Sequence, residues 1–184
     1  SDVAGVPLTV PCLHYPDAAM AAPRMLCQNL AAQLDVKTGI DVDDVDTLEA
    51  DIVILACAGA VTRFVDLPLS PVRGQTTRLK PSARSSALKA NLCYGGYLSP
   101  VDADGLHMCG ATFQPWSDVD GPLDEDDVYN MDQLRTHTGL DGFEVAGHWS
   151  AFRAATRDRF PVVGQVGEGL YVSAGHGSHG MISG

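Results

Sequence analysis

The chain has 184 residues, of which 45% are hydrophobic and 19% charged, and its formal net charge at pH 7 is −11. This composition is typical of a folded domain, and no apolar run approaches the roughly 20 residues that a membrane-spanning helix needs. The acidic balance disfavours non-specific nucleic-acid binding, which requires cations to neutralise phosphates. The five scattered cysteines have no metal-ligand spacing and favour reduced thiols in a cytoplasmic protein.

The charges are unevenly distributed along the chain. Seven acidic residues lie between Asp35 and Asp51, and seven more lie between Asp118 and Asp132. The stretch from Leu67 to Val101 has no acidic residue and five cations, namely Arg73, Arg78, Lys80, Arg84 and Lys89. Two interpretations of residues 73–89 stay open: a solvated surface loop, and a local contact for phosphates.

The first third of the sequence predicts a helix and two strands. Apolar residues at helical spacing predict an amphipathic helix over about residues 18–34, with Pro23 in its first turn. Alternation over 35–42 predicts a short strand. The run "ADIVILACAG" is continuously apolar and rich in β-branched residues, which is typical of a parallel strand buried on both faces, here over 52–57.

The remainder predicts a mixed α+β chain. Segments around 69–79, 91–100 and 105–113 are short, strand-like and separated by turn residues, which favours an antiparallel meander. Aspartates in the first turn and a stop at Gly139 predict a helix over 124–138. Further strands are expected at 143–158, 160–166 and 170–174. The strands at 52–57 and 170–174 are both typical of a parallel sheet, but no complete β-α-β unit surrounds them, so we expect part of their sheet to be missing.

Four segments, taken in order, resemble a known family: "PVRGQ" (71–75), "CYGGYLSP" (93–100), "FRAATRDRFPVVG" (152–164) and "AGHGSHGM" (174–181). Together they are similar to the later part of the D-amino-acid oxidase and glycine oxidase superfamily of FAD-dependent amine oxidoreductases. Within it, the resemblance is greatest to the oxidoreductase domain of bifunctional enzymes that modify the wobble uridine of some tRNAs.

The resemblance implies a fold and a domain division. An antiparallel-rich substrate-binding sheet with flanking helices is expected beside strands of a Rossmann-like FAD-binding domain. The implied segments are 1–70 (start of the substrate domain and an FAD-domain strand), 71–160 (substrate-binding sheet and helix) and 161–184 (return to the FAD domain). In the family, the first β-α-β unit with its G-x-G-x-x-G turn precedes the region matched by Ser1. We therefore expect an excised piece that lacks this motif and is inactive alone.

The family also implies the residues of a substrate and cofactor site. Arg153 matches an arginine that binds the substrate carboxylate, which suits a planar, always charged guanidinium. Tyr97 matches a tyrosine that lines the same pocket. The cofactor-binding positions implied are Ala58, Gly59, Gly175, His176, Gly177, Ser178, His179 and Gly180, where glycine permits close approach of the backbone. No catalytic acid or base and no metal ligand is implied, and we expect Asp158 only to hold a turn.

The implied activity is FAD-dependent oxidation of a C–N bond in a carboxylate-bearing amine, with a carboxymethylaminomethyl group on tRNA as the expected substrate. Residues 73–89 are then the expected phosphate contact. A small-molecule amine or amino-acid oxidase of the glycine oxidase type is the alternative. A third possibility is that the isolated chain is a binding module without catalysis. A serine hydrolase is disfavoured because no G-x-S-x-G motif occurs.

Overall fold

The computed structural model describes residues 2–183, which divide into two units. The first unit comprises Ser1–Ala18 and Val72–Phe152, and the second comprises Ala19–Pro71 and Arg153–Gly184. After Ala18 the chain passes into the second unit. It returns to the first unit within β2 (Leu69–Lys80) and leaves it again within β6 (Glu144–Thr156). The three sequence segments predicted above, 1–70, 71–160 and 161–184, stay a prediction.

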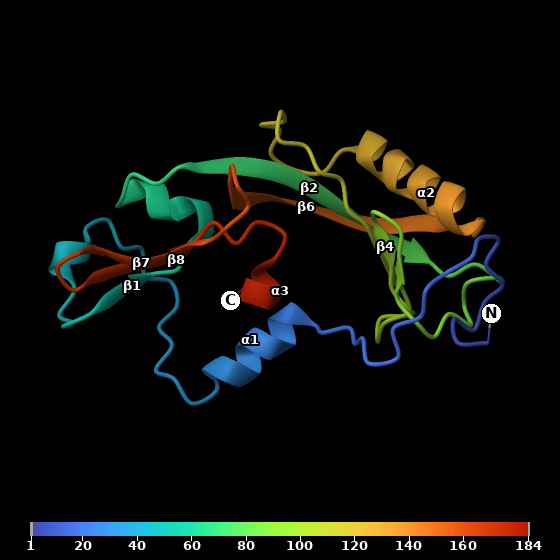
Figure 1. The fold of residues 1–184 in the computed structure, drawn as a ribbon, viewed down its shortest axis with the longest axis horizontal. Coiled ribbons are helices and arrows are strands. Elements are labelled where there is room, and N and C mark those ends of the chain that lie inside the picture. The colour runs from blue at the N-terminus through green and yellow to red at the C-terminus, as the bar shows by residue number, and fades with distance from the viewer. Residues whose placement is uncertain (1, 184) are drawn as a thin grey trace. The chain divides into compact units, whose positions relative to one another are not determined.

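A five-stranded sheet with the order β3-β4-β5-β2-β6 runs through the first unit (Figure 1). Its short strands are β3 (Leu92–Cys93), β4 (Tyr97–Leu98) and β5 (His107–Gly110). The pairs β3–β4, β4–β5 and β5–β2 are all antiparallel, with Leu98 opposite Cys109 and Cys109 opposite Thr77. This confirms the predicted antiparallel-rich sheet and the mixed α+β class.

Helix α2 (Asp124–Thr138) has the predicted bounds. Its last turn ends at Gly139, whose φ of 70° lies in the left-handed region that glycine adopts at low cost. Leu134 faces inward and is fully buried. It joins the apolar core of the unit, which consists of Ala4, Val6, Leu79, Leu88, Leu98, Cys109, Leu134 and Leu140.

Cys109 is the buried member of five free cysteines. Burial raises the pKa of its thiol to about 11, and burial likewise raises the pKa of the Tyr94 hydroxyl, which lies 3.6 Å from the Cys109 sulfur. Because only the thiolate reacts with alkylating reagents, we expect Cys109 to react at least about a hundredfold more slowly at pH 8 than an ordinary thiol. Mass spectrometry of the alkylated native protein checks this, with the exposed Cys12 and Cys93 as internal controls.

The same pKa shift sets the sign of a pH effect on stability. The folded state holds the Cys109 proton more tightly than the unfolded chain, so its contribution to stability is complete below about pH 9 and is lost as the pH rises toward about 11. In the alkylation experiment described above, labelling of Cys109 as fast as that of Cys12 would contradict the burial of the Cys109 thiol.

A three-stranded sheet with the order β1-β8-β7 forms the second unit. Strand β1 (Val53–Leu55) pairs in parallel with β8 (Leu170–Ala174), and β8 pairs antiparallel with β7 (Val162–Gly167). Both strands therefore take part in parallel pairing, as the sequence predicts, and the structure shows that they are each other's partners. The same unit holds α1 (Pro23–Ala31), the short 3₁₀ helices Val45–Thr47 and Ala58–Arg63, and α3 (Gly180–Ser183).

Three details of the second unit differ from the prediction. Ile54 of β1 is 64% exposed, so this strand is buried on one face rather than two. Residues 35–42 form no strand, because alternation does not suffice where no neighbouring strand pairs with the backbone. Helix α1 begins at Pro23, the position that proline favours, and has no buried residue. Among the described residues, no helix is long and apolar enough to cross a membrane.

Candidate functional site

The carboxyl ends of β1 and β8 meet at one edge of the three-stranded sheet, because the two strands are parallel neighbours. After β1, the chain turns into the 3₁₀ helix that begins with Ala58 and Gly59. After β8, the loop 175–180 begins at once and leads into α3. The structure therefore brings the two groups of predicted cofactor residues to the same edge, which is where α/β sheets bind their ligands.

Glycine is required in this loop for packing as well as for backbone shape. Gly175 has φ 74°, and a Cβ there would lie 2.9 Å from Leu69 Cδ2 and 3.1 Å from Thr156 Cγ2. Gly59 is different, because a Cβ at this position would meet no atom within 4 Å. Ala58 adopts φ 50°, which is uncommon for a residue with a side chain. The open side of Gly59 leaves room for a group to approach the backbone.

Hydrogen bonds within the loop 175–180 and from the loop to neighbouring strands hold it in place. The Gly177 N–H donates to the Ala154 carbonyl of β6, and the His179 N–H donates to the His176 carbonyl, both at 2.9 Å. His176 Nε2 lies 3.1 Å from the Ser173 hydroxyl. Ser178, His179 and Gly180 are exposed. The loop thus has a fixed conformation with an accessible outer part.

The expectation that the chain has no G-x-G-x-x-G spacing is wrong. Gly175, Gly177 and Gly180 have this spacing, directly after a strand and before a helix. The resemblance places the motif in a first β-α-β unit, whereas here the spacing follows β8, near the C-terminal end of the described residues.

Arg153 lies on β6, directly before the two residues whose backbone contacts the loop 175–180. Ala154 accepts the bond from Gly177, and Ala155 forms an antiparallel bridge with His176. Arg153 is half-buried, and it belongs to the same unit as the loop. The structure therefore brings the predicted carboxylate-binding arginine and the predicted cofactor loop onto adjoining backbone segments.

Tyr97 lies in the first unit, on β4, and is half-buried. Its carbonyl accepts a hydrogen bond of 3.2 Å from the Tyr94 hydroxyl. A pocket shared by Tyr97 and Arg153 stays a prediction.

Asp158 holds a turn, as the sequence predicts. Its carboxylate accepts a hydrogen bond of 3.1 Å from the Phe160 N–H. That bond is the main reason why the pKa of this exposed carboxyl lies below its usual value.

Sequence reasoning missed a buried polar network in the first unit, with Arg73 at its centre. The Arg73 side chain is fully buried and forms an ion pair with Asp126. Its other donors reach Gln114 Oε1 at 2.7 Å, the Gly121 carbonyl at 2.6 Å, and then Val119 and Gln75. All five N–H groups of the guanidinium are therefore used. A signal existed in the sequence, because Arg73, Gln75 and Thr77 alternate along β2 and share one face.

This network corrects part of the predicted phosphate contact. Arg73 is fully buried and cannot reach a phosphate. Lys80 and Arg84 are exposed, but they pair with Glu144 and Asp141 at 2.6 Å and 3.5 Å, respectively. A phosphate contact by the exposed cations of residues 73–89 stays a prediction, and it would require these surface pairs to open.

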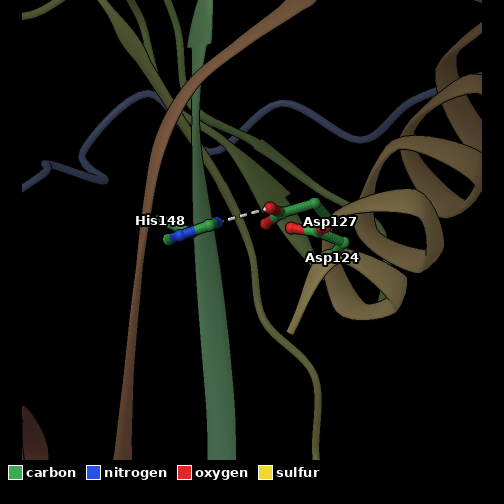
Figure 2. Close-up of side chains that lie close together, drawn as sticks. All are labelled: Asp124, Asp127 and His148. Atoms are coloured by element: carbon green, nitrogen blue, oxygen red, sulfur yellow. Dashed lines mark hydrogen bonds and ion pairs between the residues drawn. The ribbon is translucent and has the colours of Figure 1, made fainter. Parts of the chain in front are cut away.

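A second part of the network joins α2 to β6. Asp127 Oδ1 accepts from Thr77 Oγ1 at 2.6 Å and from Gln75 Nε2 at 2.9 Å, and Asp127 Oδ2 lies 2.7 Å from His148 Nδ1. Figure 2 shows His148 directed at Asp127, with Asp124 beside it. Asp127 and His148 were not singled out by sequence, because their partners lie far away along the chain.

Comparison with known proteins defines the family. The family of FAD-dependent oxidoreductases known as DAO matches residues 4–184. The chain belongs to this family, which confirms the resemblance predicted from the four segments.

The curated relatives are bifunctional proteins. The chain is 33% identical to the tRNA 5-methylaminomethyl-2-thiouridine biosynthesis bifunctional protein MnmC of Idiomarina loihiensis, over 98% of the chain and 34% of that protein. It is 31% identical to the MnmC protein of Chromohalobacter salexigens, over 100% of the chain and 34% of that protein. The chain thus spans about a third of the length of these relatives.

Solved structures share the fold at lower identity. The glycine oxidase of Geobacillus kaustophilus has a TM-score of 0.62 and 22% identity, covering 72% of this chain and 38% of that enzyme. The iminodiacetate oxidase of Chelativorans sp. BNC1 also has a TM-score of 0.62, at 20% identity, covering 73% of this chain and 39% of that enzyme.

Proposed function

We propose that the protein oxidises a C–N bond of a carboxymethylamine with FAD, and that its substrate is the carboxymethylaminomethyl group of a tRNA wobble uridine. The observation that carries the proposal is the arrangement in the second unit, where Ala58, Gly59 and the loop 175–180 lie at one sheet edge and the backbone next to Arg153 on β6 contacts that loop. The similarity to MnmC proteins supports the choice of tRNA.

The residues at the sheet edge fit a flavin. Gly59 leaves its backbone open, and the outer part of the loop, Ser178–Gly180, is exposed at the same edge. In the proposal, Ala58, Gly59 and residues 175–180 hold FAD, which accepts the hydride from the substrate carbon when bound.

The chain's own side chains bind and orient the substrate. Arg153 pairs with the substrate carboxylate through two parallel N–H donors, which fixes the carboxymethyl group in one orientation. The amine must be neutral for its α-hydrogen to leave as hydride. Loss of a hydride from the α-carbon and of a proton from the nitrogen yields an imine. Water hydrolyses this imine, which leaves the aminomethyl group on the uridine and releases the carboxymethyl carbons as glyoxylate.

The substrate is tested by assaying the full-length protein with undermodified tRNA, glycine and sarcosine. We expect aminomethyl-uridine in the tRNA, detected by nucleoside mass spectrometry. Turnover of glycine or sarcosine with no change in the tRNA would refute the tRNA substrate and favour the alternative. Turnover by residues 1–184 alone would contradict the expectation that the isolated chain only binds.

A small-molecule amine or amino-acid oxidase is the second candidate function. The net charge of −11 and the surface ion pairs of Lys80 and Arg84 favour it, because both reduce the attraction of a polyanion. In this case Arg153 would bind the carboxylate of a free amino acid by the same geometry.

The cofactor proposal is tested by Gly59→Leu in the full-length protein. The added side chain meets no protein atom near its Cβ, so folding is expected to be unaffected, while FAD is displaced and its Kd rises at least about tenfold. Fluorescence titration with FAD measures this. Gly147→Leu is the matched control, because a Cβ at Gly147 also meets nothing within 4 Å but lies in the first unit. Equal Kd values for the two variants would contradict the placement of FAD at Gly59.

A further inference from the structure

We propose that Asp124, Asp127 and His148 form a binding site for a divalent first-row metal ion, separate from the proposed cofactor edge. The site lies entirely within the first unit. Each of the three residues offers one ligand atom, and these atoms all lie within 4.8 Å of one another. Asp124 and Asp127 are three residues apart in the first turn of α2, which places them on one face of the helix, and His148 comes from β6 (Figure 2).

Asp127 is already oriented as a ligand would need to be. It is almost fully buried, and its Oδ1 is fixed by Thr77 and Gln75 of β2. The remaining oxygen, Oδ2, points at His148. Carboxylates that bind metals are commonly held in this way by hydrogen bonds from outside the ligand set. A metal ion would therefore meet a ligand whose orientation is fixed in advance.

The negative charge of the acidic side chains around this site is larger than the partial positive charge of the helix N-terminus can balance. The first turn of α2 carries Asp124, Glu125, Asp126 and Asp127, whereas the helix dipole amounts to only about half a positive charge. Arg73 neutralises Asp126, and Arg73 has no further donor to offer. Asp124, Glu125 and Asp127 thus leave an excess of negative charge, and a bound dication would compensate it.

The donor set selects the class of metal. Two carboxylate oxygens and one imidazole nitrogen suit Mn²⁺, Fe²⁺ or Zn²⁺ better than Ca²⁺ or Mg²⁺, which prefer oxygen alone. Ligand distances of about 2.0–2.2 Å require the exposed Asp124 side chain to turn inward. Binding of the ion replaces the direct hydrogen bond between His148 Nδ1 and Asp127 Oδ2.

Mn²⁺ is the sharper probe, because four cysteines are exposed and surface thiols bind Zn²⁺. The metal-free full-length protein is titrated with Mn²⁺, and free Mn²⁺ is counted by electron paramagnetic resonance. We expect one saturable site per chain in the first unit. Asp124→Asn and His148→Gln are each expected to weaken binding at least about tenfold.

Glu125→Gln is the matched control, since it removes an exposed carboxylate from the same helical turn without removing a ligand. It is expected to leave the Mn²⁺ affinity unchanged. Because Asp124 is exposed, Asp124→Asn tests the site even if His148→Gln does not fold. No saturable binding up to about 1 mM, or equal weakening by Glu125→Gln and Asp124→Asn, would overturn the proposal.

Discussion

Replacing Arg73 with methionine is expected to destabilise the protein by about 3–5 kcal/mol, as removal of one partner from a buried ion pair does. The substitution leaves the Asp126 carboxylate buried without its cation and also leaves the carbonyls of Val119 and Gly121 without their donor. Urea denaturation of the first unit's transition measures the loss. Such a loss is a large fraction of the stability of a small unit.

Two further variants test whether the loss of stability comes from the broken ion pair or from the removal of any arginine. Arg135→Ala removes an exposed arginine that pairs with Asp132, and it is expected to cost less than about 1 kcal/mol. Combining Arg73→Met with Asp126→Asn removes the uncompensated charge, so the double variant is expected to be more stable than the sum of the single losses implies. Additive losses would mean that Arg73 and Asp126 do not depend on each other.

Replacing Arg153 with alanine in the full-length protein is expected to raise the KM for the carboxylate-bearing substrate about tenfold to a hundredfold. This corresponds to the roughly 1.5–3 kcal/mol of a charge-assisted hydrogen bond. Arg153→Lys is expected to recover only part of the loss, because an ammonium group cannot bind a carboxylate through a planar pair of donors. Steady-state kinetics with tRNA that carries the carboxymethylaminomethyl group, the proposed substrate, measures both variants.

Arg157→Ala is the matched control for Arg153, since Arg157 is exposed and directly follows β6. Its KM is expected to stay unchanged. An unchanged KM in an Arg153→Ala variant that still unfolds at the same urea concentration would show that Arg153 does not bind the substrate.

Local signals in the sequence predicted the elements whose causes are local. Helix α2 was predicted with its bounds because its acidic first turn and Gly139 act within a few residues. The parallel-sheet character of β1 was predicted because a continuous β-branched run is typical of such strands, whereas its pairing with β8 comes from the structure. The prediction of a strand at 35–42 was wrong, because a strand also needs a neighbouring strand as its partner, which no local pattern reveals.

The candidate site residues also fall into two groups: those that the sequence predicted and those that only the structure revealed. Arg153 and the loop 175–180 were found through the family resemblance, and the structure then placed them on adjoining backbone. The network around Arg73 and the cluster of Asp124, Asp127 and His148 depend on contacts between residues 21 to 53 positions apart, such as Asp127 with His148 and Arg73 with Asp126. Such contacts follow from strand and helix packing, which a single sequence does not specify.

The pairing of β1 with β8 has a consequence for how the protein is made. Val53 pairs with Leu170, more than a hundred residues later in the chain. At a synthesis rate of about 5–20 residues per second, the first strand waits roughly 6–23 s on the ribosome before its partner exists. During that time β1 and the neighbouring Ile52 have no strand partner. The second unit is therefore completed last, and its early strand exposes apolar residues that can aggregate until β8 is made.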